Sequence, residues 1–204
     1  MYEWLRGKGP FFEEAGKVRC SSIMMCLIDT EDGPQVLFEK RSSNVHQPGD
    51  ISFPGGGREN GETPEENAVR ETMEELLVDR SQIDVIACLG TFTRMLNVRL
   101  DLFLCELKDY DMTFEPEEVE EVFTVPLEFF LETEPQVYNT VAEVRPEEDF
   151  PFGDIVGGRN YRWARSRDKV YFYYYKDRVI WGLTAMAIVR AVPFLKGRGE
   201  ADEG

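Results

Sequence analysis

Residues 55–78, with the sequence GGGRENGETPEENAVRETMEELLV, join a glycine-rich turn to a segment that is typical of an α-helix. Thr63 suits the N-cap of this helix, Pro64 suits its first position, and Glu66 stands where it completes a capping box with Thr63. From Pro64 to about Val78 the residues are good helix formers, without an internal glycine or proline. The stretch therefore predicts a turn followed by a helix over residues 64–78.

Glu71, Glu74 and Glu75 fall within about 100° of one another around this helix, so they share one face. The face lies in the second half of the helix, where the helix dipole disfavours anions and the like charges also repel one another. In an acid-rich chain, such a face can simply be a solvated surface. The alternative is that a divalent cation offsets the charge, and hard oxygen ligands suit Mg²⁺ or Mn²⁺.

The spacing of further residues along the sequence favours the interpretation that this face binds a cation. Six positions carry the pattern, namely Gly56, Glu62, Arg70, Glu71, Glu74 and Glu75. In residue type and separation they resemble the signature of the Nudix hydrolases. Two positions depart from it, because Thr72 replaces the usual aliphatic residue and Leu77 replaces the usual glycine. Thr72 slightly weakens the core face of the helix, and Leu77 predicts a different exit from it.

The resemblance implies a metal-dependent enzyme that hydrolyses a diphosphate bond in a nucleoside diphosphate derivative. Glu71, Glu74 and Glu75 would be the metal ligands, and Gly55 matches a position whose backbone carbonyl can add another ligand. Arg70 would hold a carboxylate in place by a bidentate contact, unless it forms only an ordinary surface pair. The resemblance also implies an α/β fold, a Nudix-type α/β/α sandwich with a mixed β-sheet.

Several groups are candidates for the general base. The only histidine, His46, lies in a polar loop, where a solvated role is favoured over catalysis. A carboxylate is the better candidate, either Glu74 of the helix or Glu118 of a later loop. The segment around Glu118 resembles the later Nudix segment that returns an acid to the site, and its other acids are rival candidates: Glu117, Glu120 and Glu121.

Three further stretches resemble the coenzyme A pyrophosphatase branch of the family: residues 37–42, 47–56 and 179–185. They imply cleavage of coenzyme A or an acyl derivative into phosphopantetheine and adenosine 3′,5′-bisphosphate. Arg41 is the expected phosphate contact, since a planar guanidinium suits such a group, although it could be a structural strand-end arginine. Arg58 and Phe53 are expected to bind substrate as well. A basic cluster over residues 159–169 either holds the extra phosphate or is a solvated loop.

Other functions stay open at this stage. ADP-ribose or a dinucleotide is the main rival substrate. A Nudix-fold nucleotide-binding module without turnover is the alternative of another class, although such a module should have lost glutamates of the signature. Processing of an RNA 5′ end is disfavoured by the formal charge of −16, which argues against a nucleic-acid partner generally.

The 204 residues suit one well-filled domain. We expect an N-terminal arm over residues 1–18, one domain over 19–197 and a flexible tail over 198–204. Four cysteines without CxxC spacing predict buried free thiols in a reducing compartment: Cys20, Cys26, Cys88 and Cys105. No secretory signal or membrane-spanning run is evident, so we expect a cytoplasmic protein with a small-molecule nucleotide substrate, no membrane contact, and a homodimer as one possible assembly.

The hydrophobic pattern predicts alternating strands and helices along the domain. Strands are expected over residues 19–29, 35–41, 51–53, 84–89, 98–105, 122–125, 136–144, 170–175 and 179–181. Two further helices are expected over residues 126–132 and 183–195. Residues 114–121 are expected to be an acidic loop or strand entry, and 153–169 are the least regular segment.

Overall fold

A computed structural model describes residues 18–94 and 98–197, and the larger of its two sheets is mixed. Its strands are β1 (Arg19–Ile28), β2 (Gln35–Arg41), β3 (Ile51–Ser52), β4 (Gly55–Gly57), β5 (Ile83–Arg94), β6 (Val98–Leu107) and β7 (Val119–Pro126). They lie in the order β3-β2-β1-β6-β5, with β4 paired to β1 and β7 paired to β2. The β1–β6 pair is parallel and the other pairs are antiparallel, so the predicted mixed sheet is confirmed.

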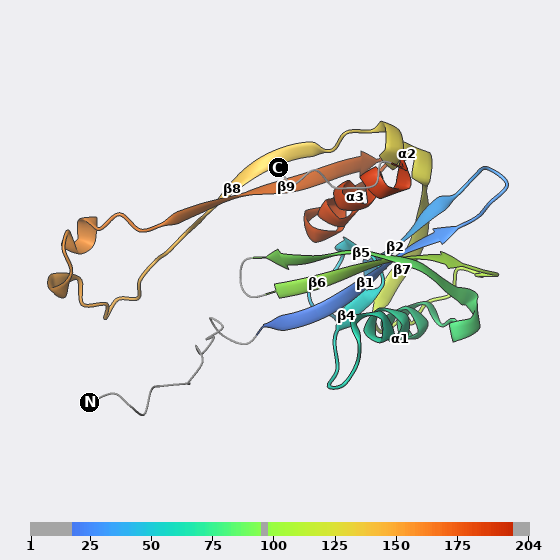
Figure 1. Ribbon diagram of the computed structural model, residues 1–204, viewed down its shortest axis with the longest axis horizontal. Coiled ribbons are helices and arrows are strands. Elements are labelled where there is room, and N and C mark those ends of the chain that lie inside the picture. Colours follow the sequence, from blue (N-terminus) through green and yellow to red (C-terminus); the bar gives the residue numbers. More distant parts are fainter. Residues whose placement is uncertain (1–17, 95–97, 198–204) are drawn as a thin grey trace, which may run out of the picture.

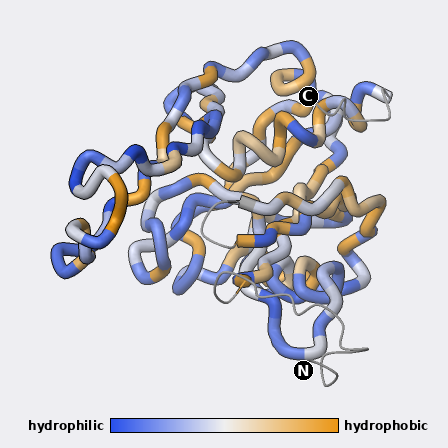
Figure 2. Tube along the Cα trace, turned by 60° about the vertical axis from the view of Figure 1, so that its left-hand side comes forward, coloured by the Kyte–Doolittle hydropathy of each residue, from blue (hydrophilic) through white to orange (hydrophobic). Residues whose placement is uncertain are grey.

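Helices cover both faces of this sheet (Figure 1). Helix α1 (Pro64–Leu76) packs on one face, while α2 (Leu127–Glu132) and α3 (Gly182–Leu195) lie on the other. Short 3₁₀ turns occur at Arg80–Gln82, Phe152–Asp154 and Gly158–Asn160. The predicted α/β/α sandwich is therefore present. Figure 2 shows the hydrophobic segments gathered within the layers, with hydrophilic loops around them.

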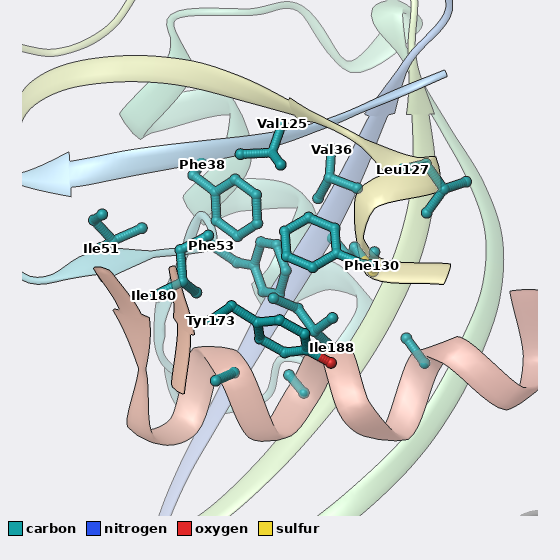
Figure 3. Packing of buried hydrophobic residues seen from close by; sticks show 14 of the residues in the cluster. Val36, Phe38, Ile51, Phe53, Val125, Leu127, Phe130, Tyr173, Ile180 and Ile188 are labelled. Carbon is teal, nitrogen blue, oxygen red and sulfur yellow. The ribbon is translucent and has the colours of Figure 1, made fainter. Parts of the chain in front are cut away.

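The two core clusters follow the period of two along the strands. On β6, Leu102 and Leu104 point to the α3 side, whereas Phe103 and Cys105 point to the α1 side. The α3-side core is rich in aromatic rings (Figure 3), and Phe38 stacks on Phe53 with ring centroids 5.0 Å apart. Because both faces of the sheet are covered, both sets of side chains on β6 are buried.

Strands β1 and β2 pair only near the turn that joins them, at Leu27–Val36 and Ile28–Gln35. Beyond that point the two strands separate, and β3 and β4 fill the space between them. Strand β3 pairs with β2, β4 pairs with β1, and the Met24 N–H donates to the Pro54 carbonyl at 2.9 Å. This split in the sheet brings the glycine-rich segment next to the middle of β2.

A second, three-stranded sheet has the order β10-β9-β8. It consists of β8 (Gln136–Glu143), β9 (Arg165–Tyr175) and β10 (Arg178–Trp181). Its β9–β10 end packs against α3 and α2, and β8 and β9 extend beyond the body as a ribbon (Figure 1). The predicted hairpin around Lys176 and Asp177 is confirmed by the β9–β10 pairing.

Several expectations need correction. The glycine-rich segment is not a turn, because Gly55–Gly57 pairs with β1 as strand β4. Strand β5 is longer than predicted, because its pairing with β6 continues past two irregularities in the register. Strand β7 begins at Val119 rather than at residue 122, because its first residues pair with the end of β2. All but the last residue of the predicted N-terminal arm, and the whole of the predicted tail, fall outside the described residues.

The exit of α1 also differs from the expectation. Leu77 adopts the left-handed conformation, with φ 54° and ψ 46°, which is the conformation that glycine favours at this position. The Leu77 side chain is 53% exposed, so solvent accommodates it and the chain leaves the helix as it would with glycine. The cysteines are free thiols, but Cys88 is exposed and Cys20 is half-buried, because both lie near the margins of the sheet.

Candidate active site

The start of α1 is fixed by the predicted capping box. The Thr63 hydroxyl accepts from the Glu66 N–H at 3.2 Å, and the Glu66 carboxylate accepts from the Thr63 N–H at 2.8 Å. These bonds satisfy two backbone donors that the first helical turn would otherwise leave unpaired. They fix the first turn of the helix, and in its second half Glu71 and Glu75 face the glycine-rich strand β4.

Glu75 is the most enclosed of these glutamates. The residue is 3% exposed, and its side-chain Oε2 accepts from the Gly55 N–H at 2.8 Å. Burial, followed by repulsion from Glu39, raises the pKa of Glu75 to about 9. At neutral pH, the metal-free protein therefore keeps a proton at this position.

Glu71 lies directly against Gly56. A Cβ atom at residue 56 would be 2.5–2.6 Å from the carboxylate of Glu71, which is closer than atoms can approach. The Asn67 side-chain amide donates to Glu71 Oε1 at 3.4 Å and to the Gly57 carbonyl at 3.1 Å. Burial raises the pKa of the Glu71 carboxyl, although Arg70 opposes this. The glycine at 56 thus makes room for the Glu71 carboxylate.

Arg70 holds three acids together. Its Nε donates to Glu62 Oε1 at 2.7 Å, and its two terminal nitrogens lie 2.9 Å from Glu71 Oε1 and 2.9 Å from Glu74 Oε2. One of them also donates to the Gly57 carbonyl at 3.2 Å. Arg70 therefore ties α1 to both the loop before it and strand β4, more than a simple i,i+4 surface pair would.

Glu39, on β2, is a member of the cluster that the sequence analysis did not single out. It is 1% exposed, and its Oε1 accepts from the Ser52 hydroxyl at 2.9 Å. Its Oε2 is buried and has no hydrogen-bond partner among the described residues. Burial raises the pKa of Glu39 to about 7. The available signal was an acid within the apolar run of β2, since Val36, Leu37 and Phe38 are all fully buried.

Glu118 approaches the same cluster from the loop before β7. Its charge raises the pKa of both Glu39 and Glu71, and its carbonyl accepts from the Ser42 N–H at 2.9 Å. The rival acids are engaged elsewhere, because Glu117 accepts from Asn44, Glu120 pairs with Lys40, and Glu121 makes a bidentate pair with Arg178.

The cluster is not a finished metal site. Among the described residues, no three acidic, cysteine or histidine side chains are arranged to hold a metal ion as they stand. Glu74 is 57% exposed at its side chain and is turned toward Arg70. The donor set nevertheless fits a hard divalent cation, because it consists of carboxylates and includes a buried Glu39 oxygen without a hydrogen-bond partner among the described residues. Burial, and after it repulsion between neighbouring carboxylates, raises the pKa of both Glu39 and Glu75.

A cavity of about 340 Å³ opens beside Gly55 and is lined mainly by apolar groups. Arg41 lies at its rim, and its Nε donates to the His46 carbonyl at 2.9 Å while its guanidinium is 3.9 Å from Glu39 Oε1. Phe53 contributes to the cavity wall, but the residue is only 2% exposed and belongs mainly to the core. Trp181 is 41% exposed and stacks on Phe172.

The remaining predicted residues lie apart from this cavity. Arg58 lines a separate cleft between β1 and the loop before α1, where it lies close enough to lower the pKa of Glu62. The basic cluster over residues 159–169 lies on the ribbon and the loop at its end (Figure 1), where Arg159 covers the Phe152 ring and Arg165 pairs with Glu143. The structure does not bring these groups to the glutamates.

A family model described as "NUDIX domain" matches residues 18–144, which is more than half of the chain. The chain belongs to the Nudix family. It is 32% identical over 191 residues to "Nudix hydrolase 22, chloroplastic" of Arabidopsis thaliana, covering 89% of this chain and 57% of that protein. It is 31% identical over 185 residues to "Nudix hydrolase 15, mitochondrial" of the same plant, covering 86% and 58%.

A third Nudix relative is the "Peroxisomal coenzyme A diphosphatase NUDT7" of Mus musculus, which is 32% identical over 121 residues, covering 57% of this chain and 50% of that protein. The chain thus spans little more than half the length of these relatives. With the mixed sheet between two helical layers, the family assignment confirms the predicted Nudix-type fold.

Proposed function

We propose that this Nudix protein hydrolyses a diphosphate bond in a nucleoside diphosphate derivative with the help of divalent metal ions. The observation that carries the proposal is the gathering of Glu39, Glu71 and Glu75 against strand β4, beside a cavity with Arg41 at its rim. Crowded carboxylates are costly unless cations or protons neutralise them, and a diphosphate substrate needs the same cations.

In this proposal Glu71, Glu74 and Glu75 hold Mg²⁺ or Mn²⁺, with the Gly55 carbonyl as a further ligand and Glu39 as an acid close to them. Glu74 would join the site by leaving its contact with Arg70. The bound ion would neutralise charge on the phosphate oxygens and lower the pKa of a water molecule. Arg70 acts as a positioning residue, because it would still hold Glu71 and Glu62.

Hydrolysis requires a base near the attacking water. Glu118 or Glu74 would accept a proton as the water oxygen bonds to phosphorus and the bond from phosphorus to the bridging oxygen breaks. Glu118 is a candidate because it approaches the cluster from the loop before β7. Each product then carries one of the two phosphates.

Coenzyme A or an acyl derivative is the substrate that we favour. The relative from mouse is named a coenzyme A diphosphatase, and residues 37–42, 47–56 and 179–185 resemble that branch. The cavity joins a cationic rim at Arg41 to apolar walls, which suits a phosphate next to a long, weakly polar group. Phosphopantetheine and adenosine 3′,5′-bisphosphate would be the products.

The test is a panel of coenzyme A, ADP-ribose, a reduced dinucleotide and a short capped RNA, each with Mg²⁺ or Mn²⁺. Products are identified by mass, and phosphopantetheine from coenzyme A is the expected result. Turnover of none of the panel would instead favour a nucleotide-binding module.

Glu74→Gln should lower kcat/KM by about 100-fold or more, because it removes an anionic ligand. Glu65→Gln is the matched control, since Glu65 is an exposed acid in the first turn of the same helix. If Glu74→Gln kept activity within about threefold of the parent protein, its role in the metal site would be wrong.

No helix among the described residues is long and apolar enough to cross a membrane. Residence in the cytoplasm stays a prediction. Fractionation of cells that produce the full-length protein would test it, because two of the relatives are named as chloroplastic and mitochondrial proteins.

A further inference from the structure

Strand β8 is an edge of the small sheet, and its outer side pairs with no other strand in residues 18–94 and 98–197. Its register with β9 is regular over eight residue pairs, without a bulge. Edge strands are usually protected from pairing by lysine, proline or a bulge. From Gln136 to Ala142 the strand has neither a charged residue nor a proline, so this edge is unprotected.

Apolar groups on β8 are also left in solvent. Val137, Tyr138 and Val141 are 47%, 52% and 58% exposed, which is three large hydrophobic residues in a strand of eight. Strand β10 covers β9 only as far as Phe172, so the ribbon beyond it has two strands. Because a two-stranded ribbon is only marginally stable in water, this part of the protein would gain from a further strand.

We propose that a second copy of this chain supplies that strand. Two β8 strands would pair antiparallel around a twofold axis and join the small sheets into one sheet with the order β10-β9-β8-β8-β9-β10. Such an interface is isologous, because each copy presents the same edge to the other. The inference goes beyond the proposed hydrolysis and does not depend on it.

One register is favoured by the side chains. With the axis at Asn139, Val137 of each copy faces Val141 of the other, which pairs apolar with apolar. Tyr138 of each copy then faces Thr140 of the other copy. Residues 136–142, which pair in this register, carry no charge, so two copies can meet at this edge although each chain carries a net charge of −16.

The first experiment measures molar mass by light scattering across a dilution series of the full chain. We expect a dimer that dissociates on dilution, with Val141→Glu raising the dissociation midpoint by about tenfold or more. Val141 is exposed and faces Arg167 across the β8–β9 pair, so a glutamate is tolerated in the monomer. Val156→Glu is the matched control, because Val156 is 93% exposed and lies in the loop beyond the ribbon.

The second experiment tests the register. Residues that face each other across antiparallel strands have Cα atoms about 4.5–5.5 Å apart, which is within the range of a disulfide. Asn139→Cys should therefore form a disulfide-linked dimer under mild oxidation. The same reaction of Val156→Cys and of the parent protein, which has an exposed Cys88, gives the background.

A parent protein that stays monomeric at every concentration would overturn the proposal and leave the β8 edge for an extended peptide of another protein. A dimer that resists Val141→Glu, or that does not cross-link through Asn139→Cys, would also overturn it, because the copies would then meet through another surface.

Discussion

Two buried carboxyl groups, those of Glu39 and Glu75, determine how the site responds to protons and cations. Both residues are almost fully buried, and within the part of the chain that the structure describes the guanidinium closest to Glu39, that of Arg41, is 3.9 Å from its carboxylate. The Gly55 N–H partly compensates the charge of Glu75, whereas one oxygen of Glu39 has no hydrogen-bond partner in residues 18–94 and 98–197. Without a cation, binding of protons is the most favourable way to neutralise the carboxyl groups of Glu39 and Glu75.

The stability of the metal-free protein should therefore fall as the pH rises. The pKa is about 7 for Glu39 and about 9 for Glu75 in the folded state, compared with about 4.3 in an unfolded chain. Between about pH 4.5 and pH 9 the folded state binds more protons, so its free energy of unfolding decreases with pH. The midpoint of thermal unfolding in the presence of a chelator should be lower at about pH 9 than at about pH 6.

Glu75→Gln is the control for this prediction, because an amide stays neutral at every pH and should flatten the dependence. Added Mn²⁺ should reverse the trend, since it binds the deprotonated carboxylates. A parent protein and a Glu75→Gln variant with the same pH dependence would contradict the assignment of the effect to this residue.

Gly56 permits the position of Glu71, so Gly56→Ala should disable the site without unfolding the sheet. The added methyl group would lie 2.5–2.6 Å from the Glu71 carboxylate, which must then move away from β4. A displacement of about 1 Å at a catalytic group can cost about 100-fold in rate, and we expect a loss of that size in kcat/KM. Gly57→Ala is the control, because a Cβ atom there meets nothing within 4 Å. Equal activities of the two variants would show that Glu71 is not held in place by this contact.

At the level of elements, α1 is well capped at its N-terminus and poorly capped at its C-terminus. Its N-terminus carries a complete capping box and a proline in the first turn, which stabilise the helix start. Its C-terminus has no basic residue in the last turn, and a leucine holds the left-handed cap position. The helix that presents the glutamates is therefore strained at the end nearest to Glu74 and Glu75.

Leu77→Gly should raise the free energy of unfolding by about 0.5–1 kcal/mol, because glycine adopts φ 54° without the clash that a Cβ atom makes. Little packing is lost, as the Leu77 side chain is 53% exposed. Chemical denaturation would measure the change. Leu77→Ala keeps the strained Cβ atom and should bring no gain, so a stabilisation by alanine as large as that by glycine would rule out this explanation.

The elements also show what could be predicted from the sequence. The capping box, the shared face of Glu71, Glu74 and Glu75 and the β9–β10 hairpin depend on neighbouring residues, so local pattern was sufficient for them. Glu39 could not be assigned in this way, because it joins the cluster only through the separation of β1 and β2 around β3 and β4. The left-handed Leu77 was missed because leucine rarely adopts this conformation and nothing in the local sequence marks it.

At the scale of the whole molecule, the cavity is formed by both sheets. Ile23, Phe53 and Leu100 come from the large sheet and its loops, while Val170 and Trp181 come from the small sheet. Aromatic rings between the two sheets set their separation. Phe130 touches Phe38 on the first and Tyr173 on the second, with ring centroids 5.7 Å and 5.2 Å apart (Figure 3).

Phe130→Leu should therefore act on substrate binding from a distance. We expect a loss of about 1–2 kcal/mol in stability and a larger change in KM than in kcat, because the sheets shift while α1 and β4 keep their contacts. Steady-state kinetics with the best substrate of the panel would measure both constants. A change confined to kcat would mean that the ring supports the glutamates rather than the cavity.

The separation of β1 and β2 has a further consequence for how such a protein can diverge. The carboxylates that we propose as metal ligands are held by β4 and α1 in one half of the molecule, whereas part of the cavity wall belongs to the C-terminal half. Changes in the C-terminal half can therefore accumulate without disturbing the acids. The proposed reaction could in this way be inherited unchanged while the substrates diverged.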